Sequence, residues 1–328
     1  MKTNPDISII VTNWNGAKFI EDCISTLWKS GEESRRPFEL IVVDDVSSDG
    51  SPEMIKKEYP DVRLIRNPKN MGFARTSNRG AREAAGRIIV MMNNDMRVPV
   101  DFIEKITAPF YEERDENDLR LFAVGAKTVD WHDGSPNHLC MDAAWRRGGI
   151  GLVWSDPKER CRTVFPQGGS AAYDKELYLK MGGFDPIFYP TYWDDYDLSY
   201  RAVKSGWEVL YEPAAVADHL GQATLKRQTS LSRRQQIIER NRLWFNWLNL
   251  DDPVLLMRHF AAIPWICARD IIRGRGLNGL FGFLRAAKGS LKVIKKKISR
   301  RKKDPTCIIP DTKILQPENF GRKKYYEI

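Results

Sequence analysis

Cysteine and histidine are scarce in this sequence, and the scarcity excludes several kinds of site. The 328 residues include five cysteines and four histidines. The cysteines are odd in number, widely scattered, and form no Cys-x-x-Cys pair: Cys23, Cys140, Cys161, Cys267 and Cys307. This pattern argues against a zinc knot and a disulfide framework, and it favours a reducing compartment.

Long apolar runs are also missing. A membrane-spanning helix needs about 20 consecutive apolar residues. The most apolar stretch, residues 254–272, is interrupted by Arg258, His259, Arg269 and Asp270. Near the N-terminus, Lys2 and Asp6 interrupt any apolar segment of the secretory type. We therefore expect neither a spanning helix nor a secretory signal.

Positive charge is unevenly distributed. The net charge is +9, but residues 271–303 carry 12 lysines and arginines and no acid. Subtracting these 12 charges leaves about −3 for the remaining chain. A hydrophobic content of 42% is high enough to form a sizeable core. The basic character therefore belongs to a C-terminal segment and not to the folded body.

Strand-like and helix-like segments alternate in the first hundred residues. Residues 7–12 (ISIIVT) and 40–43 (LIVV) are short apolar runs, typical of strands covered on both faces. Apolar residues recur at helical spacing between them. The alternation continues with helices near 52–58 and 76–85 and strands at 62–66 and 87–92, and it predicts a parallel, doubly wound α/β sheet. Further along, we expect strands at 121–125 and 207–211 and helices near 174–180, 194–205 and 231–250.

Polar residues follow three of these strands at the point where each strand ends. They are residues 12–15 (TNWN), 44–45 (DD) and 93–95 (NND). In a doubly wound sheet, the crevice outside the carboxyl ends of the strands binds the ligand. The sequence therefore predicts a binding site at this edge of the sheet.

Acidic residues of the site region suggest a metal ion and a proton acceptor. Asp45 and Asp95 follow strands, Asp194 and Asp195 open a helix, and His219 follows a late strand. Carboxylates that gather at one sheet edge repel one another, and a shared divalent cation is the usual reason for such a cluster. An ion held by a carboxylate, an imidazole and a diphosphate would neutralise a departing diphosphate, while another carboxylate takes a proton from the attacking hydroxyl.

The order of these segments resembles the family 2 glycosyltransferases of GT-A fold. The segments are ISIIVTNWNG, VVDDVSSDGS, NMGFARTSNRG, NNDM, GGFDPIFYPTYWDDYDLSYRAVKSGW and ADHLG, and they span about residues 7–250. Within the family, the sequence looks closest to the branch of bacterial rhamnosyl- and galactofuranosyltransferases. The resemblance implies an α/β, GT-A Rossmann-like nucleotide-diphosphosugar transferase fold with a C-terminal amphipathic helical tail.

The resemblance also implies roles for individual residues. Asp95 and His219 would hold Mg²⁺ or Mn²⁺, Asp195 would be the general base, and Asp194 its catalytic neighbour. Eight further positions would bind the nucleotide sugar or shape the loop and helix beneath it: Thr12, Asn13, Trp14, Asp45, Asn70, Gly72, Asn78 and Asn94.

One position departs from the family pattern. Asn93 stands where the first acid of the family's Asp-x-Asp motif often stands, so that metal binding would be weak until the donor diphosphate arrives. The departure leaves open a non-catalytic relative that binds nucleotide sugar or glycan as a partner subunit. A single base on the face opposite the leaving group would imply direct displacement with inversion.

Each motif taken alone also has a structural interpretation. Asp44-Asp45 and residues 93–95 are good turn sequences, Asp194-Asp195 suits the N-terminus of a helix, and His219 alone suits a structural role. Two further groups stay open between packing and ligand contact. The first is the aromatic run Phe188, Tyr189, Tyr192 and Trp193, and the second is the pair Arg240 and Asn241.

The basic C-terminal segment predicts a membrane-associating region. Apolar residues at 277–284 precede the Lys/Arg cluster, as in amphipathic helices that lie on an anionic bilayer. A solvated basic tail is the alternative, and no motif supports nucleic-acid binding. We expect a catalytic domain at 1–250, the amphipathic region at 251–303 and a tail at 304–328. The prediction is an inverting, metal-dependent glycosyltransferase at the cytoplasmic face of the cell membrane. It would use a glycan or lipid-linked acceptor in cell-surface polysaccharide biosynthesis.

Overall fold

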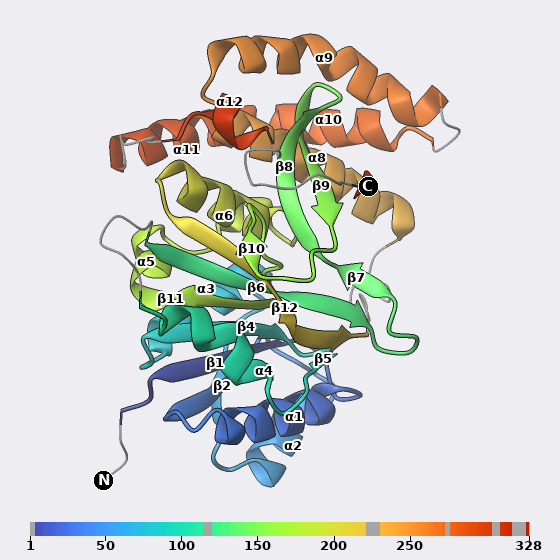
Figure 1. The fold of residues 1–328 in the computed structure, drawn as a ribbon. Coiled ribbons are helices and arrows are strands. Elements are labelled where there is room, and N and C mark those ends of the chain that lie inside the picture. The colour runs from blue at the N-terminus through green and yellow to red at the C-terminus, as the bar shows by residue number, and fades with distance from the viewer. Residues whose placement is uncertain are drawn as a thin grey trace.

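The computed structural model describes residues 4–113, 120–220, 230–272, 276–303, 309–316 and 326–327. Figure 1 shows a twisted central sheet with helices on both faces and a layer of C-terminal helices stacked at one end of the molecule. The protein is therefore a mixed α/β structure, as the sequence predicts.

The central sheet is parallel in its N-terminal half. The strand order is β10-β12-β6-β11-β4-β1-β2-β3, and β1 pairs in parallel with both β2 and β4. The strands of this half are β1 (Ile7–Asn13), β2 (Phe38–Asp44), β3 (Arg63–Arg66) and β4 (Ile88–Asn93). All four strands begin and end within a few residues of the predicted segments.

Beyond the first hundred residues, from which parallel strands were predicted, the sheet also contains antiparallel strands. Strand β11 (Ser170–Asp174) runs antiparallel between β4 and β6 (Leu121–Asp130). The chain enters β11 directly from a loop at the carboxyl edge of β4, where Asn93 N donates to Gly169 O. A parallel strand would need a long crossover first, so the short approach dictates the antiparallel direction.

The two faces of the sheet pack against different helices because strand side chains alternate in direction. Ile9 and Val11 of β1 pack with α1 (Ile20–Glu33) and α4 (Phe102–Thr107) in one core, whereas Ile10 belongs to the core on the other face. The helices that contribute to this second core are α3 (Phe73–Glu83), α5 (Lys175–Lys180), α6 (Asp194–Lys204) and α8 (Leu231–Asn249). The first core also includes α2 (Ser51–Glu58).

The middle of the chain holds the strands that sequence patterns missed. They are β5 (Met96–Arg97), β7 (Pro136–His138), β8 (Cys140–Arg146), β9 (Gly149–Ser155), β10 (Cys161–Arg162) and also β11. β12 (Glu208–His219) includes the strand predicted at 207–211 and continues to His219. β8 and β9 form a hairpin, to which β13 (Tyr326–Glu327) adds a third strand. Short 3-10 helices lie at Ala108–Phe110 and Pro186–Phe188.

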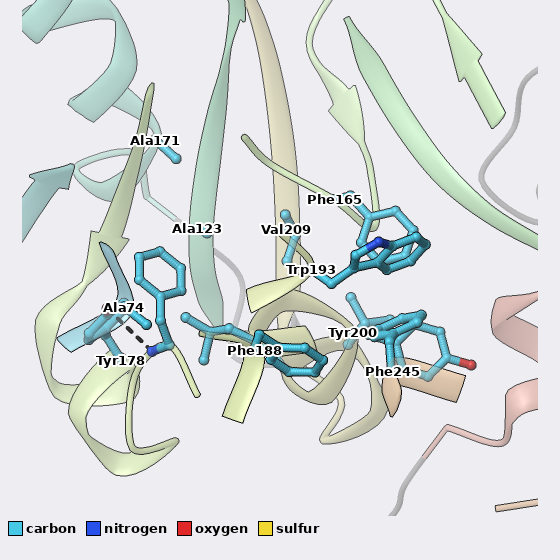
Figure 2. Close-up of a cluster of buried hydrophobic side chains, with 14 of the residues drawn as sticks. Ala74, Ala123, Phe165, Ala171, Tyr178, Phe188, Trp193, Tyr200, Val209 and Phe245 are labelled. Carbon is cyan, nitrogen blue, oxygen red and sulfur yellow. Dashed lines mark hydrogen bonds between the residues drawn. The ribbon is translucent and has the colours of Figure 1, made fainter. Parts of the chain in front are cut away.

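An aromatic cluster joins α6 to α8 beneath the central sheet. Figure 2 shows Phe165, Trp193, Tyr200 and Phe245 side by side. The ring centroids of Trp193 and Phe245 are 5.0 Å apart, and those of Tyr200 and Phe245 are 5.6 Å apart. Aromatic pairs at this separation stabilise beyond the area that they bury. The start of α6 is thus fixed by packing against α8.

The C-terminal helices pack on α8, on α6 and on strand β9. They are α9 (Pro253–Ile272), α10 (Asn278–Lys288), α11 (Ser290–Lys303) and the short α12 (Asp311–Ile314). The indole of Trp244 on α8 donates to Ala286 O of α10 at 3.0 Å. Within the described residues, no helix is long and apolar enough to cross a membrane.

Candidate functional site

The site is a cavity of about 770 Å³ at the carboxyl ends of β1, β2 and β4. Eleven of the twelve residues singled out from the sequence line it: Thr12, Asn13, Trp14, Asp45, Asn70, Gly72, Asn94, Asp95, Asp194, Asp195 and His219. The structure thus brings together groups more than 200 residues apart in the chain. Their individual roles remain predictions.

Asn13 connects the ends of two neighbouring strands. It is buried, and its side-chain amide donates to Asp44 Oδ1 at 3.0 Å and to the hydroxyl of Ser51 at 2.9 Å. Its Oδ1 accepts from Asn94 Nδ2 at 2.8 Å. Since these bonds occupy the Asn13 side chain, its contact with a ligand would run through the backbone. Asn13 lines the cavity, and Asp44, which does not, holds the Asn13 side chain in place from behind.

Asp45 anchors the loop that forms one wall of the cavity. Its carboxylate accepts from Met71 N at 2.7 Å, Gly72 N at 2.9 Å and Asn67 Nδ2 at 2.8 Å. Gly72 has φ of 76° and ψ of 167°, a region that is nearly exclusive to glycine. A Cβ at this position would lie 2.8 Å from the ring of Tyr189. The absence of a side chain at Gly72 therefore keeps this wall in place.

Asp95 and His219 face each other across the cavity floor. After β4 the chain turns into β5, which pairs with the end of β12 so that Met96 lies opposite His219. This register brings Asp95 Oδ1 to 3.5 Å from His219 Nε2, and both side chains are buried. The side-chain amide of Asn137 lies 3.2 Å from His219 Nδ1 and orients the ring.

The side chains of Asp95 and His219 fit a divalent ion whose coordination shell a diphosphate and water would complete. One carboxylate and one imidazole are too few for a closed structural site. Consistently, no group of three or more His, Cys, Asp or Glu residues able to hold a metal occurs in the described part of the chain. Asn93 also lines the cavity, where an acid would have supplied a further ligand.

Asp194 and Asp195 begin α6 and differ in their hydrogen bonding. Asp195 accepts from Gly168 N at 3.1 Å and from Tyr196 N at 2.9 Å. Asp194 is 3% exposed, and its Oδ2 has no hydrogen-bond partner among the described residues. Burial raises the pKa of Asp195, and burial together with the charge of Asp195 raises the pKa of Asp194 well above its usual range. In both carboxyl groups the protonated form is thus favoured relative to an ordinary aspartate.

Asn78 is the one predicted residue that lies outside the cavity. Its amide donates to Phe184 O at 2.7 Å, and its Oδ1 accepts from the hydroxyl of Tyr178 at 2.7 Å and from Phe184 N at 3.0 Å. These bonds fix the turn at residues 182–184 to α3. The contacts of Asn78 are thus structural, and a direct contact with nucleotide is not supported.

The aromatic residues at 188–193 divide between core and cavity, and Arg240 and Asn241 bind the backbone of this segment. Phe188 is buried in the core and does not line the cavity. Trp193 is also buried but lines the cavity together with Tyr192 and with Tyr189, which is 49% exposed. The amide of Asn241 donates to Phe188 O, Thr191 O and Tyr192 O, and Arg240 donates to Tyr189 O. Both α8 side chains therefore hold the backbone of the aromatic loop.

Sequence patterns missed a group of cavity residues that includes Asn137, the hydrogen-bond partner of His219. Asp130, Ser135, Pro136, Asn137 and His138 line the cavity at the turn between β6 and β7. Burial and the nearby charge of His219 lower the pKa of His138 to about 4, so the ring is neutral near pH 7. The only sequence signal was the turn-rich stretch at 130–137 (DWHDGSPN), which carries no ligand motif.

Solved structures share this fold. A GalNAc-transferase crystallised with UDP, GalNAc and Mn²⁺ superposes with a TM-score of 0.61 at 17% identity, covering 80% of this chain and 51% of that chain. A mannosyltransferase from Pyrobaculum calidifontis in complex with GDP-Man and Mn²⁺ gives 0.52 at 19% identity, covering 96% and 88%. The fold is therefore that of the GT-A glycosyltransferases.

Curated relatives match part of their own length. An N-acetylgalactosaminyltransferase 7 of Drosophila melanogaster is 24% identical over 56% of this chain and 34% of its own. A glucosyl-dolichyl phosphate glucuronosyltransferase of Haloferax volcanii is 22% identical over 55% of this chain and 56% of its own. The chain thus spans about a third to a half of the length of these relatives. The family model "Glycosyl transferase family 2" matches residues 8–178, more than half of the sequence, and the chain belongs to that family.

Proposed function

We propose that the chain is an inverting, metal-dependent glycosyltransferase that moves a sugar from a nucleotide-diphosphate donor to a hydroxyl of a glycan or lipid-linked acceptor. One observation carries the proposal: the Asp95–His219 pair and the Asp194–Asp195 pair line the same cavity. Structures of the same fold with UDP or GDP-Man and Mn²⁺ support a nucleotide-sugar donor.

The donor half of the cavity is formed by the strand ends. Trp14, Asp45 and the loop at Gly72 surround the space for base and ribose. Asp95 and His219 would hold the metal, whose positive charge would stabilise the departing diphosphate. A nitrogen ligand suits Mn²⁺ better than Mg²⁺, which prefers oxygen ligands.

The acceptor half of the cavity contains the proton acceptor. Asp195 lies at the start of α6 and lines the same cavity as Tyr192 and the exposed ring of Tyr189. With its pKa raised, Asp195 takes the proton from the acceptor hydroxyl as that oxygen attacks the anomeric carbon. A single base and no enzymatic nucleophile give inversion at that carbon.

Substitution of Asp195 tests the proposal. Asp195→Asn keeps the size of the side chain and removes its basicity, so transfer should fall by about 10²–10⁴-fold while UDP and GDP binding with Mn²⁺ stays within about two-fold. Asp101→Asn, which removes an exposed acid on the opposite side of the sheet, serves as the control. Unchanged transfer by Asp195→Asn would refute the assigned base.

A panel of nucleotide-sugar donors tests which sugar the protein transfers. The resemblance noted in the sequence points to rhamnose or galactofuranose, whereas the relatives are GalNAc-, glucuronosyl- and mannosyltransferases. We would assay metal-dependent hydrolysis of the corresponding UDP-, GDP- and dTDP-sugars. Nucleotide binding without turnover of any donor would instead favour the non-catalytic alternative, which Asn93 motivates.

We also propose that the C-terminal helices rest on the cytoplasmic face of the cell membrane, where the enzyme would serve cell-surface polysaccharide biosynthesis. Large apolar side chains are exposed on these helices: Met257, Phe260, Trp265, Phe281, Leu284, Leu291, Ile294 and Ile298. Lys288, Lys292 and Lys295 are exposed beside them and form no ion pair with described residues. Both features suit an anionic bilayer interface.

Vesicle sedimentation tests the membrane proposal. The protein should bind vesicles with phosphatidylglycerol and not those of phosphatidylcholine alone. Replacing Lys288, Lys292 and Lys295 by Glu should abolish binding, because each lysine near an anionic surface contributes about 1 kcal/mol. Equal binding to both kinds of vesicle would refute the electrostatic part of the proposal.

A further inference from the structure

A buried ion cluster connects the basic helix α11 to both ends of the segment that forms the acceptor wall. Arg300 on α11 donates through Nη1 to Asp197 Oδ1 and through Nη2 to Asp197 Oδ2, both at 2.8 Å. The same Nη2 donates to Asp185 Oδ2 at 2.6 Å. One guanidinium therefore binds two carboxylates that lie 12 residues apart in the chain.

The two carboxylates bracket the catalytic part of the cavity. Asp185 precedes the 3-10 helix at Pro186–Phe188, and its Oδ1 accepts from Ile187 N at 3.0 Å. Asp197 lies in the first turn of α6, whose first two residues are Asp194 and Asp195. Between them lie the aromatic loop and the proposed base.

Burial makes this connection strong and directional. The side chains of Asp197, Asp185 and Arg300 are 0%, 6% and 18% exposed. Asp197 also accepts from Arg201 Nε and from Asn249 Nδ2, both at 2.9 Å. Ion pairs shielded from water are screened little by salt, and a planar guanidinium fixes the geometry of the carboxylates that it binds.

No sequence motif pointed to this contact. Arg300 is one of 12 basic residues in the segment that was assigned to a membrane surface, and it lies 103 residues beyond Asp197. On α11, Lys296, Lys297 and Arg301 also turn toward acids of the body. Part of the basic segment thus belongs to the scaffold of the active site.

We propose that Arg300 is a positioning residue for the transfer reaction. By binding Asp185 and Asp197 together, Arg300 fixes the acceptor wall and the Asp194–Asp195 pair. The proposal rests on the proposed function for its kinetic consequence. Among the described residues, the hydrogen bonds and ion pairs of Asp185, Asp197 and Arg300 reach none of β1, β2 and the loop at residues 67–72, which form the nucleotide half of the cavity. Acceptor use should therefore depend on Arg300 more than nucleotide binding does.

Arg300→Lys tests the proposal, because lysine retains the charge but cannot bind both carboxylates with a planar fork. We expect kcat for transfer to fall by about 10- to 100-fold, because small displacements of catalytic groups lower reaction rates by such factors. Affinity for UDP with Mn²⁺ should stay within about two-fold, and amide exchange over residues 186–196 should accelerate. Arg301→Lys on the same helix, which touches only Asp251 among the described acids, is the matched control.

A second variant, Asp185→Asn, tests the same connection from the other side. If Arg300→Lys does not fold, Asp185→Asn releases one end of the segment and retains the bond to Ile187 N, and it should show the same pattern. Wild-type transfer and unchanged amide exchange in the variant would overturn the proposal, as would a parallel loss of nucleotide binding and transfer. If wild-type protein transfers no sugar, the proposed function fails, and amide exchange alone decides the role of Arg300.

Discussion

Replacement of Gly72 by alanine should weaken nucleotide binding by about ten-fold or more. The backbone at Gly72 has φ of 76° and ψ of 167°, and placing a side chain in that region costs about 1–3 kcal/mol. The new methyl group would also lie 2.8 Å from the ring of Tyr189 and 3.3 Å from Pro190 O. The exposed tyrosine ring can turn away, so the backbone strain is the larger contribution.

The strain is relieved by rotating the loop, and this rotation is what affects the ligand. It pulls Gly72 N away from Asp45 Oδ2, a 2.9 Å hydrogen bond at the cavity wall. A loss of about 1.4 kcal/mol from the binding free energy corresponds to a ten-fold weaker affinity. Calorimetric titration with UDP and with GDP, each with Mn²⁺, measures it.

Gly50→Ala is the matched control. Gly50 has φ of 81°, but a Cβ there meets nothing within 4 Å. We expect it to lower the melting temperature, through a backbone cost of about 1–2 kcal/mol, without changing nucleotide affinity. If Gly72→Ala binds nucleotide as tightly as Gly50→Ala does, the loop does not form the nucleotide wall.

Three further substitutions, at positions 93, 194 and 197, lead to predictions for stability and metal binding. Asp194→Asn should raise the free energy of unfolding at pH 7 by about 1–3 kcal/mol, because it removes a buried carboxyl group whose Oδ2 has no hydrogen-bond partner among the described residues. Asp197→Asn should lower the free energy of unfolding by about 3–5 kcal/mol, because Arg201 and Arg300 lose the buried carboxylate that they share. Because the pKa of Asp194 is raised in the folded state, Asp194 destabilises the folded protein more and more as the pH rises above the ordinary aspartate range. In denaturant titrations, the gain in free energy of unfolding from Asp194→Asn should therefore vanish below about pH 4. Asn93→Asp should tighten Mn²⁺ binding measured without nucleotide, since it adds a carboxylate to the cavity that contains Asp95 and His219; unchanged affinity would show that position 93 faces away from the ion.

The sequence predicted the half of the site whose signal is local. Strands β1, β2 and β4 are continuous apolar runs that end abruptly in polar residues, so both the strands and their ligand-facing ends could be located. The hairpin of β8 and β9 was missed, although Arg147 and Gly148 at its turn both have positive φ, as hairpin turns require. Its strands lack clean alternation because β8 is buried along most of its length.

Contacts between distant parts of the chain could not be derived from local patterns. The approach of Asp95 to His219 depends on the pairing of two-residue strand β5 with β12, 123 residues later in the chain. The binding of Arg300 by Asp197 likewise spans 103 residues. Composition described α11 as basic, but which basic side chains turn inward depends on where the helix packs.

The ion pairs of Arg300 on α11 have a practical consequence for the design of shortened forms of this protein. A shortened chain ending at residue 250 would retain every family motif yet lose Arg300, and two buried carboxylates would lose their main counter-ion. Such a fragment would preserve the nucleotide floor while loosening the opposite wall. If Arg300 acts as proposed, the shortest chain expected to carry out the proposed transfer extends to Arg300 on α11, well past residue 178, where the match to the family model ends.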